Sequence, residues 1–110
     1  MVLYFLQWDL PDQKANLTIY ENKAKNDWLP LTLGHEGVRE IRNYRNPLEV
    51  TPQVAISIEF ESIDTWRSFL DSQDYIRIMR ELRILGCHNF TARLWYPSKY
   101  FPESIKPKGK

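Results

Sequence analysis

Two charged residues, Glu59 and Arg93, occupy positions in the sequence where a charge needs either a partner or a ligand. Glu59 falls within residues 54–60 and Arg93 within residues 89–95, and in both segments apolar and polar residues alternate. If each segment is a strand, both charges lie on the side opposite the apolar residues. They can then form an ion pair, within one chain or between two chains. Alternatively, Glu59 is a catalytic base and Arg93 holds an anionic ligand.

Ser57 and Trp95 lie on the same side of these two segments as the charges. Ser57 and Ala55 are small, and the space that they leave suits either a ligand or a partner chain. Trp95 can stack on a flat aromatic molecule, although the default place of the chain's many aromatic residues is the core or an interface. We therefore predict Ser57, Arg93 and Trp95 as ligand-binding candidates beside Glu59.

His35 is a second candidate for a catalytic base. It lies in the turn at residues 34–37, and its imidazole suits proton transfer at the rim of a pocket because its ordinary pKa is close to neutrality. The alternative is an ordinary turn histidine beside a capping glycine. His88 and the single cysteine, Cys87, are not spaced to build a metal site, so we predict no metal centre.

Three arginines, Arg77, Arg80 and Arg83, recur every three residues, as they would in a phosphate-binding ridge on a helix. The acids Asp74 and Glu81 are interspersed with them, which favours a solvated helix face instead. The formal net charge of +1 agrees, because no bulk field attracts nucleic acid or an anionic membrane. We expect neither as a partner.

The composition is that of one soluble globular domain. Of the 110 residues, 43% are hydrophobic and 26% are charged, which argues against disorder, a coiled coil or a disulfide-stapled miniprotein. A single cysteine cannot form an internal disulfide, and the apolar start of the chain lacks the basic residues of a signal peptide. These features predict a protein of the reducing cytoplasm.

The elements that must position the candidate residues follow from hydrophobic periodicity. Strands are predicted at residues 2–8, 38–45, 54–60 and 89–95. Residues 12–29 carry an apolar stripe at helical spacing, which predicts a helix. We expect Asp9 or Asp12 to cap its start, and Pro30 and then Gly34 to end it.

A second helical region begins at the cap Ser62, breaks with a fresh cap at residues 71–74 and stops at Gly86. The order β-α-β-β-α-β predicts an α+β fold of the ferredoxin-like type, with a four-stranded antiparallel sheet of order 4-1-3-2 and both helices on one face. Residues 1–97 would form this single domain, followed by an extended tail at residues 98–110. The other face of the sheet is left bare, which predicts a homodimer.

This layout resembles the dimeric α+β barrel superfamily, as do the segments 28–31 (WLPL) and 35–38 (HEGV) and the capped, aromatic start of residues 62–70. The superfamily includes antibiotic-biosynthesis monooxygenase-like, EthD-like and stress-responsive barrel proteins. The resemblance implies that two subunits pack sheet against sheet, with a small-molecule pocket in the barrel or between each sheet and its helices. Haem-degrading members place a histidine on the second helix; residues 62–86 contain none, so we expect no haem and no other cofactor.

Three functions fit these expectations. The first is a homodimeric barrel that binds a small polar or aromatic molecule; the second is a cofactor-independent oxygenase or isomerase; the third is a structural or regulatory dimer. If the first strand lies between those of Glu59 and Arg93, these side chains are about 10 Å apart. A ligand in that gap would bind its charge to Arg93, stack on Trp95 and exchange a proton with Glu59 or His35.

Overall fold

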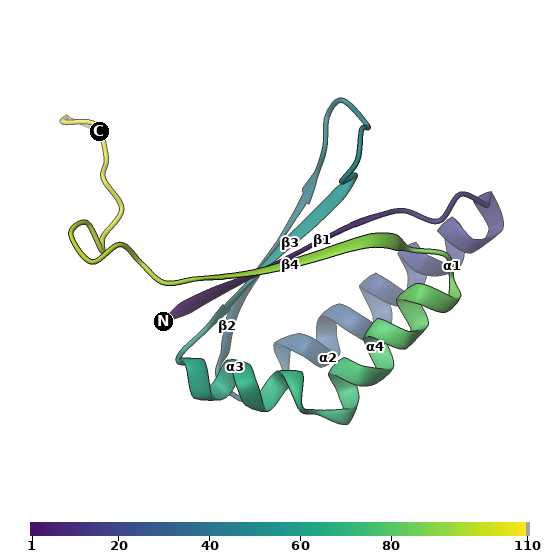
Figure 1. Ribbon diagram of the computed structural model, residues 1–110, viewed down its shortest axis with the longest axis horizontal. Helices are drawn as coiled ribbons and strands as arrows, with labels where there is room; N and C mark the ends of the chain where they lie inside the picture. Colours follow the sequence, from purple (N-terminus) through teal and green to yellow (C-terminus); the bar gives the residue numbers. More distant parts are fainter. Residues whose placement is uncertain (110) are drawn as a thin grey trace.

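The computed structural model describes residues 1–109, in which one layer is a sheet and the other is helical (Figure 1). The strands are β1 (Val2–Asp9), β2 (Val38–Arg45), β3 (Val54–Phe60) and β4 (His88–Trp95). The helical segments are α1 (Lys14–Lys23), the π-helical turn η1 (Ala24–Trp28), α2 (Leu29–Leu33), α3 (Ile63–Leu70) and α4 (Gln73–Ile84). The strand order β2-β3-β1-β4, antiparallel throughout, confirms the predicted fold class. Among the described residues, no helix has the length and apolar character needed to cross a membrane.

The alternating sequence of the central strands determines which face of the sheet the helices cover. On β1, every second residue from Val2 to Trp8 is buried: Val2, Tyr4, Leu6 and Trp8. Ile58 and Phe60 of β3 are almost completely buried on the same side. The intervening residues, such as Leu3 and Phe5, are only partly covered, because they lie on the open face. Figure 1 shows all the helices on one side of the sheet.

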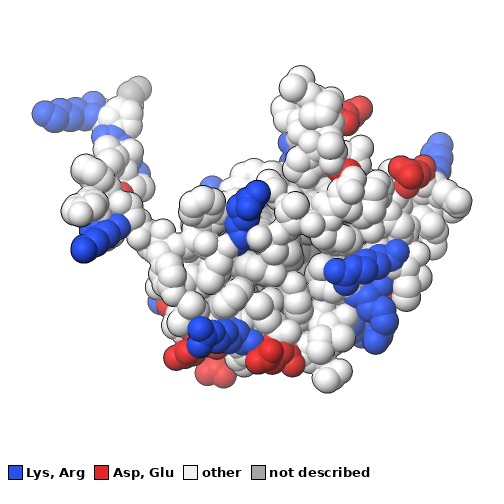
Figure 2. Space-filling model, in the orientation of Figure 1, with Lys and Arg blue, Asp and Glu red and all other residues white. Residues whose placement is uncertain are grey.

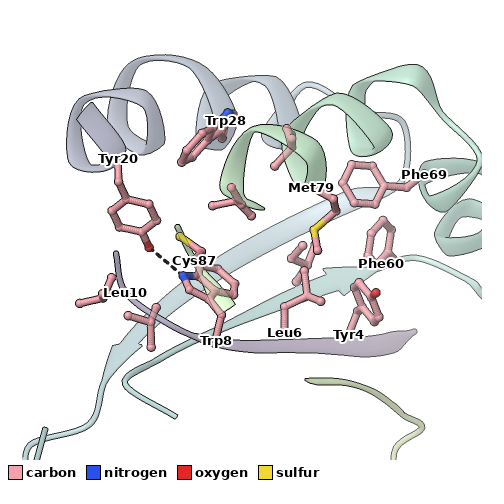
Figure 3. Packing of buried hydrophobic residues seen from close by; sticks show 14 of the residues in the cluster. Tyr4, Leu6, Trp8, Leu10, Tyr20, Trp28, Phe60, Phe69, Met79 and Cys87 are labelled. Atoms are coloured by element: carbon pink, nitrogen blue, oxygen red, sulfur yellow. Dashed lines mark hydrogen bonds between the residues drawn. The ribbon is translucent and has the colours of Figure 1, made fainter. Parts of the chain in front are cut away.

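The core between the sheet and the helices is rich in aromatic side chains (Figure 3). Trp8 Nε1 donates to the Tyr20 hydroxyl over 3.2 Å, and burial raises the pKa of Tyr20 to about 12. The hydroxyls of Tyr4 and Tyr75 lie 2.9 Å apart and join β1 to α4. Cys87 is buried in the same cluster, where burial raises the pKa of its thiol to about 12. The thiol is therefore a packing group rather than a nucleophile.

The start of the first helix differs from the prediction. α1 begins after Gln13, and no side chain caps it. Asp9 instead completes β1: Thr51 Oγ1 and Asn89 Nδ2 donate to its carboxylate over 2.6 and 2.8 Å, as does the amide of Gln53 over 3.0 Å. These hydrogen bonds, that of Thr51 above all, hold the pKa of Asp9 below its ordinary value. Asp9 cannot cap α1 because its oxygens already join β1 to the segments that begin β3 and β4.

The first helix was expected to end at Pro30 and then Gly34, and only Gly34 is confirmed. The chain passes Pro30 without leaving the helix and continues to Leu33, after which Gly34 is the C-cap. In η1 the amide of Leu29 donates to the carbonyl of Ala24, five residues earlier. A proline ring collides with the carbonyl four residues before it in a regular α-helix, and the wider π turn relieves that collision. The proline therefore shapes the helix without ending it.

The second helical region is divided as predicted. Ser62 accepts a hydrogen bond from the Thr65 amide over 3.2 Å, and the Thr65 hydroxyl accepts one from the Ser62 amide, which completes a capping box at α3. The fresh cap at α4 is Ser72, whose hydroxyl oxygen accepts from the Tyr75 amide over 3.1 Å. Gly86 follows α4 with φ of 103°, a conformation that glycine adopts without strain.

Arg77 of α4 does not belong to a solvated face. Its guanidinium donates to both carboxylate oxygens of Asp27 in η1, over 3.0 and 2.8 Å, and to Glu81 over 2.9 Å. Glu81 also accepts from Trp28 Nε1 over 2.9 Å. The hydrogen bonds from Arg77 hold the pKa of Asp27 at about 2. This network joins η1 to α4, and the spacing of the arginines could not reveal a partner on another helix.

Candidate functional site

The open face of the sheet contains a hollow of about 240 Å³ near one end of β2 and β3. Seven residues from three strands line it: Leu3, Phe5, Glu40, Arg42, Tyr44, Ser57 and Glu59. The strand register places Glu40 opposite Glu59 and Arg42 opposite Ser57. The structure therefore brings Ser57 and Glu59 together, and it adds five side chains that were not predicted from the sequence: Leu3 and Phe5 of β1, and Glu40, Arg42 and Tyr44 of β2.

A β-bulge in β2 turns the three side chains of that strand toward the hollow. Val38 pairs with Phe60 and Glu40 pairs with Glu59, so one extra residue of β2 lies between two consecutive residues of β3. As a result, Val38 and Ile41 both pack against the core although they are three residues apart. The alternation in the sequence looked loose for this reason. The spacing of Glu40, Arg42 and Tyr44 by two residues was the available signal.

The charges in the hollow do not balance within one chain. Arg42 Nε donates to Glu40 Oε1 over 2.6 Å, and this hydrogen bond raises the pKa of Arg42. Within residues 1–109, Glu59 forms no ion pair, and its direct neighbour across the strands is the like-charged Glu40. Glu59 is thus an acceptor available to a ligand or to a cation of a partner chain. No group of three side chains that could hold a metal occurs among the described residues.

Arg93 and Trp95 lie on the same open face but beyond β1. Two rows of paired residues cross the sheet from β3 through β1 to β4, namely Ser57-Phe5-Arg93 and Glu59-Leu3-Trp95. Because neighbouring strands are nearly 5 Å apart, two strand spacings put Arg93 about 10 Å from β3, as the predicted strand order required. Leu3 and Phe5 of β1 occupy the gap between Glu59 and Arg93 in which a ligand was expected. Arg93 and Trp95 therefore belong to the same face but not to the lining of the hollow.

His35 lies on the helical side of the sheet. Its ring packs edge-on against Phe69 of α3, with ring centroids 5.1 Å apart, and its carbonyl accepts from the amide of Val38. Its Nδ1 is buried without a hydrogen-bond partner among residues 1–109. Of the two alternative bases predicted, Glu59 lines the hollow and His35 does not.

A second cavity, of about 60 Å³, lies between the sheet and the helices. Its lining is mostly apolar and aromatic and includes Trp8, Tyr20 and Tyr75. The two tyrosine hydroxyls are already hydrogen bonded, to Trp8 and to Tyr4. The volume holds a few water molecules but no organic molecule unless the helices move. The hollow on the open face is the candidate site, because Ser57 and Glu59 line it.

These features define a ferredoxin-like α+β protein whose sheet carries helices on one face and a partly polar hollow on the other. No protein-family profile and no curated protein matches the sequence. Solved structures do match. The chain is similar to a proposed antibiotic biosynthesis monooxygenase from Deinococcus radiodurans, with 11% identity, a TM-score of 0.76 and coverage of 99% of this chain and 100% of that one.

Two further solved structures share the arrangement. A dimeric protein of unknown function with a ferredoxin-like fold, from Bacteroides fragilis, has 16% identity and a TM-score of 0.69, and the match covers 86% of this chain and 93% of that one. SnoaB from Streptomyces nogalater, a cofactor-independent oxygenase, has 11% identity and a TM-score of 0.67 over 99% and 97% of the two chains. At these identities the similarity confirms the predicted resemblance at the level of the fold.

Proposed function

We propose that the protein is a homodimer whose two open sheet faces pack against each other and enclose a small polar or aromatic molecule. The observation that carries the proposal is the open face itself, which combines uncovered apolar side chains with a hollow around an unpaired carboxylate. Tyr44 is 47% exposed and Trp95 is 54% exposed on this face. A second sheet would remove both from water, because contiguous apolar patches on soluble proteins mark interfaces.

The lining of the hollow suggests the chemistry of the ligand. Ser57 offers a hydroxyl, Glu59 a carboxylate and Arg42 a guanidinium, while Phe5 and Tyr44 offer aromatic surface. One hollow of about 240 Å³ is small for an organic ligand, but two hollows that meet across the interface reach the usual range of about 300 to 1,000 Å³. The site would therefore be complete only in the dimer.

The dimer is tested by placing a charge at the centre of the open face. Phe5 pairs with Arg93 across the strands, so the substitution Phe5→Lys would place a like charge beside Arg93 in each chain and add two charges to the interface. We expect the wild type to sediment as a dimer at micromolar concentration and Phe5→Lys to sediment as a monomer. Ile84→Lys, on an exposed position of α4, is the matched control and should stay dimeric. A monomeric wild type would refute the proposal.

The ligand is tested by native mass spectrometry of the purified dimer. We expect a bound small molecule in the wild type and its loss in Glu59→Gln, with the dimer intact or more stable because an unpaired carboxylate is removed. Arg93→Met should weaken retention less, since Arg93 lies beyond Phe5. If the wild-type dimer carries no bound molecule and both variants weaken the dimer, these charges are interface contacts. That result would favour a structural or regulatory dimer.

A cofactor-independent oxygenase or isomerase is the second candidate. The similarity to SnoaB, described as a cofactor-independent oxygenase, favours it, because the two chains align over almost their whole lengths. Glu59 is then the base that removes a proton from the bound molecule. The purified protein should convert the copurified molecule without an added cofactor, and Glu59→Gln should slow that conversion at least about 100-fold. Retention without conversion would leave binding as the function.

A further inference from the structure

The C-terminal tail and the β2–β3 loop both project on the side of the sheet away from the helices (Figure 1). The loop comprises residues 46–53, and the tail comprises residues 96–109, which contain no regular helix or strand. In Figure 1 they rise on opposite sides of the open face, so a second sheet packed on that face would lie between them.

The tail is apolar but touches little of its own chain. Tyr100, Phe101 and Ile105 are 80%, 68% and 78% exposed. The amides of Tyr100 and Phe101 donate to Ser98 Oγ over 3.3 Å, and no hydrogen bond joins residues 97–109 to the rest of the described chain. Three large apolar side chains within six residues are unusual for a solvated end, which points to a surface that covers them.

The charges of the tail are opposite to those at the end of the sheet from which it leaves. Residues 96–109 carry three lysines and one glutamate. Where β2 begins, β3 ends and α3 begins, the chain places five acids: Glu36, Glu40, Glu59, Glu61 and Asp64. Arg39 pairs with Glu61 and Arg42 pairs with Glu40, and α3 also carries Arg67, so the positive charges offset the acids only in part. Figure 2 shows acidic side chains over α3 at this end with basic side chains among them, and the lysines of the tail well apart.

The tail is long enough to reach a second copy. Trp95, the last residue of β4, lies in the same row across the sheet as Glu59. Packed sheets are about 10 Å apart, and the four residues from Trp95 to Lys99 extend up to about 14 Å. Lys99 can therefore cross to the facing sheet, and the residues up to Lys108 can follow its edge.

We propose that the tail of each copy crosses the interface and lies on the acidic end of the other copy, where its lysines face Glu36 and Asp64, which form no ion pair within the described residues of their own chain. The tail of the second copy then covers the hollow with Tyr100 and Phe101 and leaves the Glu59 carboxylate inside it to the ligand. This inference rests on the dimer proposed above and goes beyond it, because the site becomes a composite of two chains.

Zero-length cross-linking tests the crossing directly. Wild-type protein labelled with ¹⁵N is mixed and re-equilibrated with unlabelled protein, and a carbodiimide then couples lysine amines to carboxylates in contact with them. We expect peptides that join Lys99, Lys106 or Lys108 of one isotope to acids of residues 36–64 of the other isotope. Tail cross-links that always join chains of the same isotope would show that the tail folds onto its own chain, which would overturn the proposal.

Substitutions give an independent measurement. The triple variant Lys99→Gln, Lys106→Gln and Lys108→Gln should raise the dimer dissociation constant about tenfold at low salt and less at high salt, because the lost attraction is screened. Lys14→Gln with Lys25→Gln, on exposed positions of α1 and η1, is the control and should leave the constant unchanged.

Removal of residues 98–110 separates this inference from the proposed function. We expect the shortened protein to form a dimer at least about tenfold weaker than that of the full chain, while Phe5→Lys forms none. A shortened protein with an unchanged dimer constant would overturn the crossing tail and leave the sheet-to-sheet dimer standing. A monomeric full chain would remove both.

Discussion

At the scale of single residues, the best-connected charges of the molecule hold helices together and do not belong to the candidate site. Asp27 and Arg77 form two parallel hydrogen bonds, and Glu81 receives both Arg77 and the Trp28 indole. Such a bidentate pair is stronger than an ordinary surface ion pair, because its geometry is fixed at both ends. Within residues 1–109, by contrast, Glu59 forms no ion pair, which is the reason for proposing a ligand or a second copy there.

The Asp27 carboxylate should make stability depend on pH in a defined window. Its pKa is about 2 in the folded protein against an ordinary value of 3.8, so its contribution is present above about pH 4 and is lost as the pH falls toward 2. Asp27→Asn should lower the free energy of unfolding at pH 7 by about 1 to 2 kcal/mol and flatten its fall in that window. Urea titrations at several pH values measure this. The exposed Asp12→Asn is the control and should keep the wild-type slope.

At the scale of elements, the sequence predicted the sheet well because alternation on β1, β3 and β4 is regular, and it predicted the α3–α4 break because the capping residues are local. It failed where a distant partner decided the outcome. Asp9 was expected to cap α1, yet three donors from the segments before β3 and at β4 occupy it. Glu40 escaped selection because the bulge in β2 hid its alternation. Local patterns thus predicted the elements and two of the seven residues that line the hollow, Ser57 and Glu59, and pairing between elements decided the rest.

The turn between α2 and β2 gives the sharpest test at this scale. Gly37 has φ of 85°, and a Cβ there would lie 2.4 Å from Thr65 Cβ, so Gly37→Ala would strain the backbone and push α3 away. We expect a loss of about 2 kcal/mol or more in the free energy of unfolding. Gly34→Ala is the matched control: its Cβ meets nothing closer than 3.6 Å, and it should be neutral or slightly stabilising. Equal effects of the two changes in urea unfolding would contradict this account of the turn.

At the scale of the whole molecule, the fold leaves one face of its sheet without a covering layer. Helices bury every second residue of β1 on one face, while Leu3 and Phe5 are only partly covered on the other. The three solved structures described above are only 11 to 16% identical in sequence to this chain, so they support the fold and not the chemistry. Function has to be argued from the hollow around Glu59 and from what covers it.

If the second sheet completes the core, folding and association should be linked. The melting temperature of the wild type should then rise with protein concentration, because mass action favours the folded dimer over two unfolded chains. A hundredfold increase in protein concentration adds about 2.7 kcal/mol to the free energy of unfolding of the dimer. For a dimer of two 110-residue chains this corresponds to a rise of about 5 to 10 °C in the melting temperature. Phe5→Lys, expected to be monomeric, should melt at one temperature throughout the range. Calorimetry or circular dichroism across the two concentrations measures both, and a wild-type melting temperature that does not move would mean that each chain is stable without its partner.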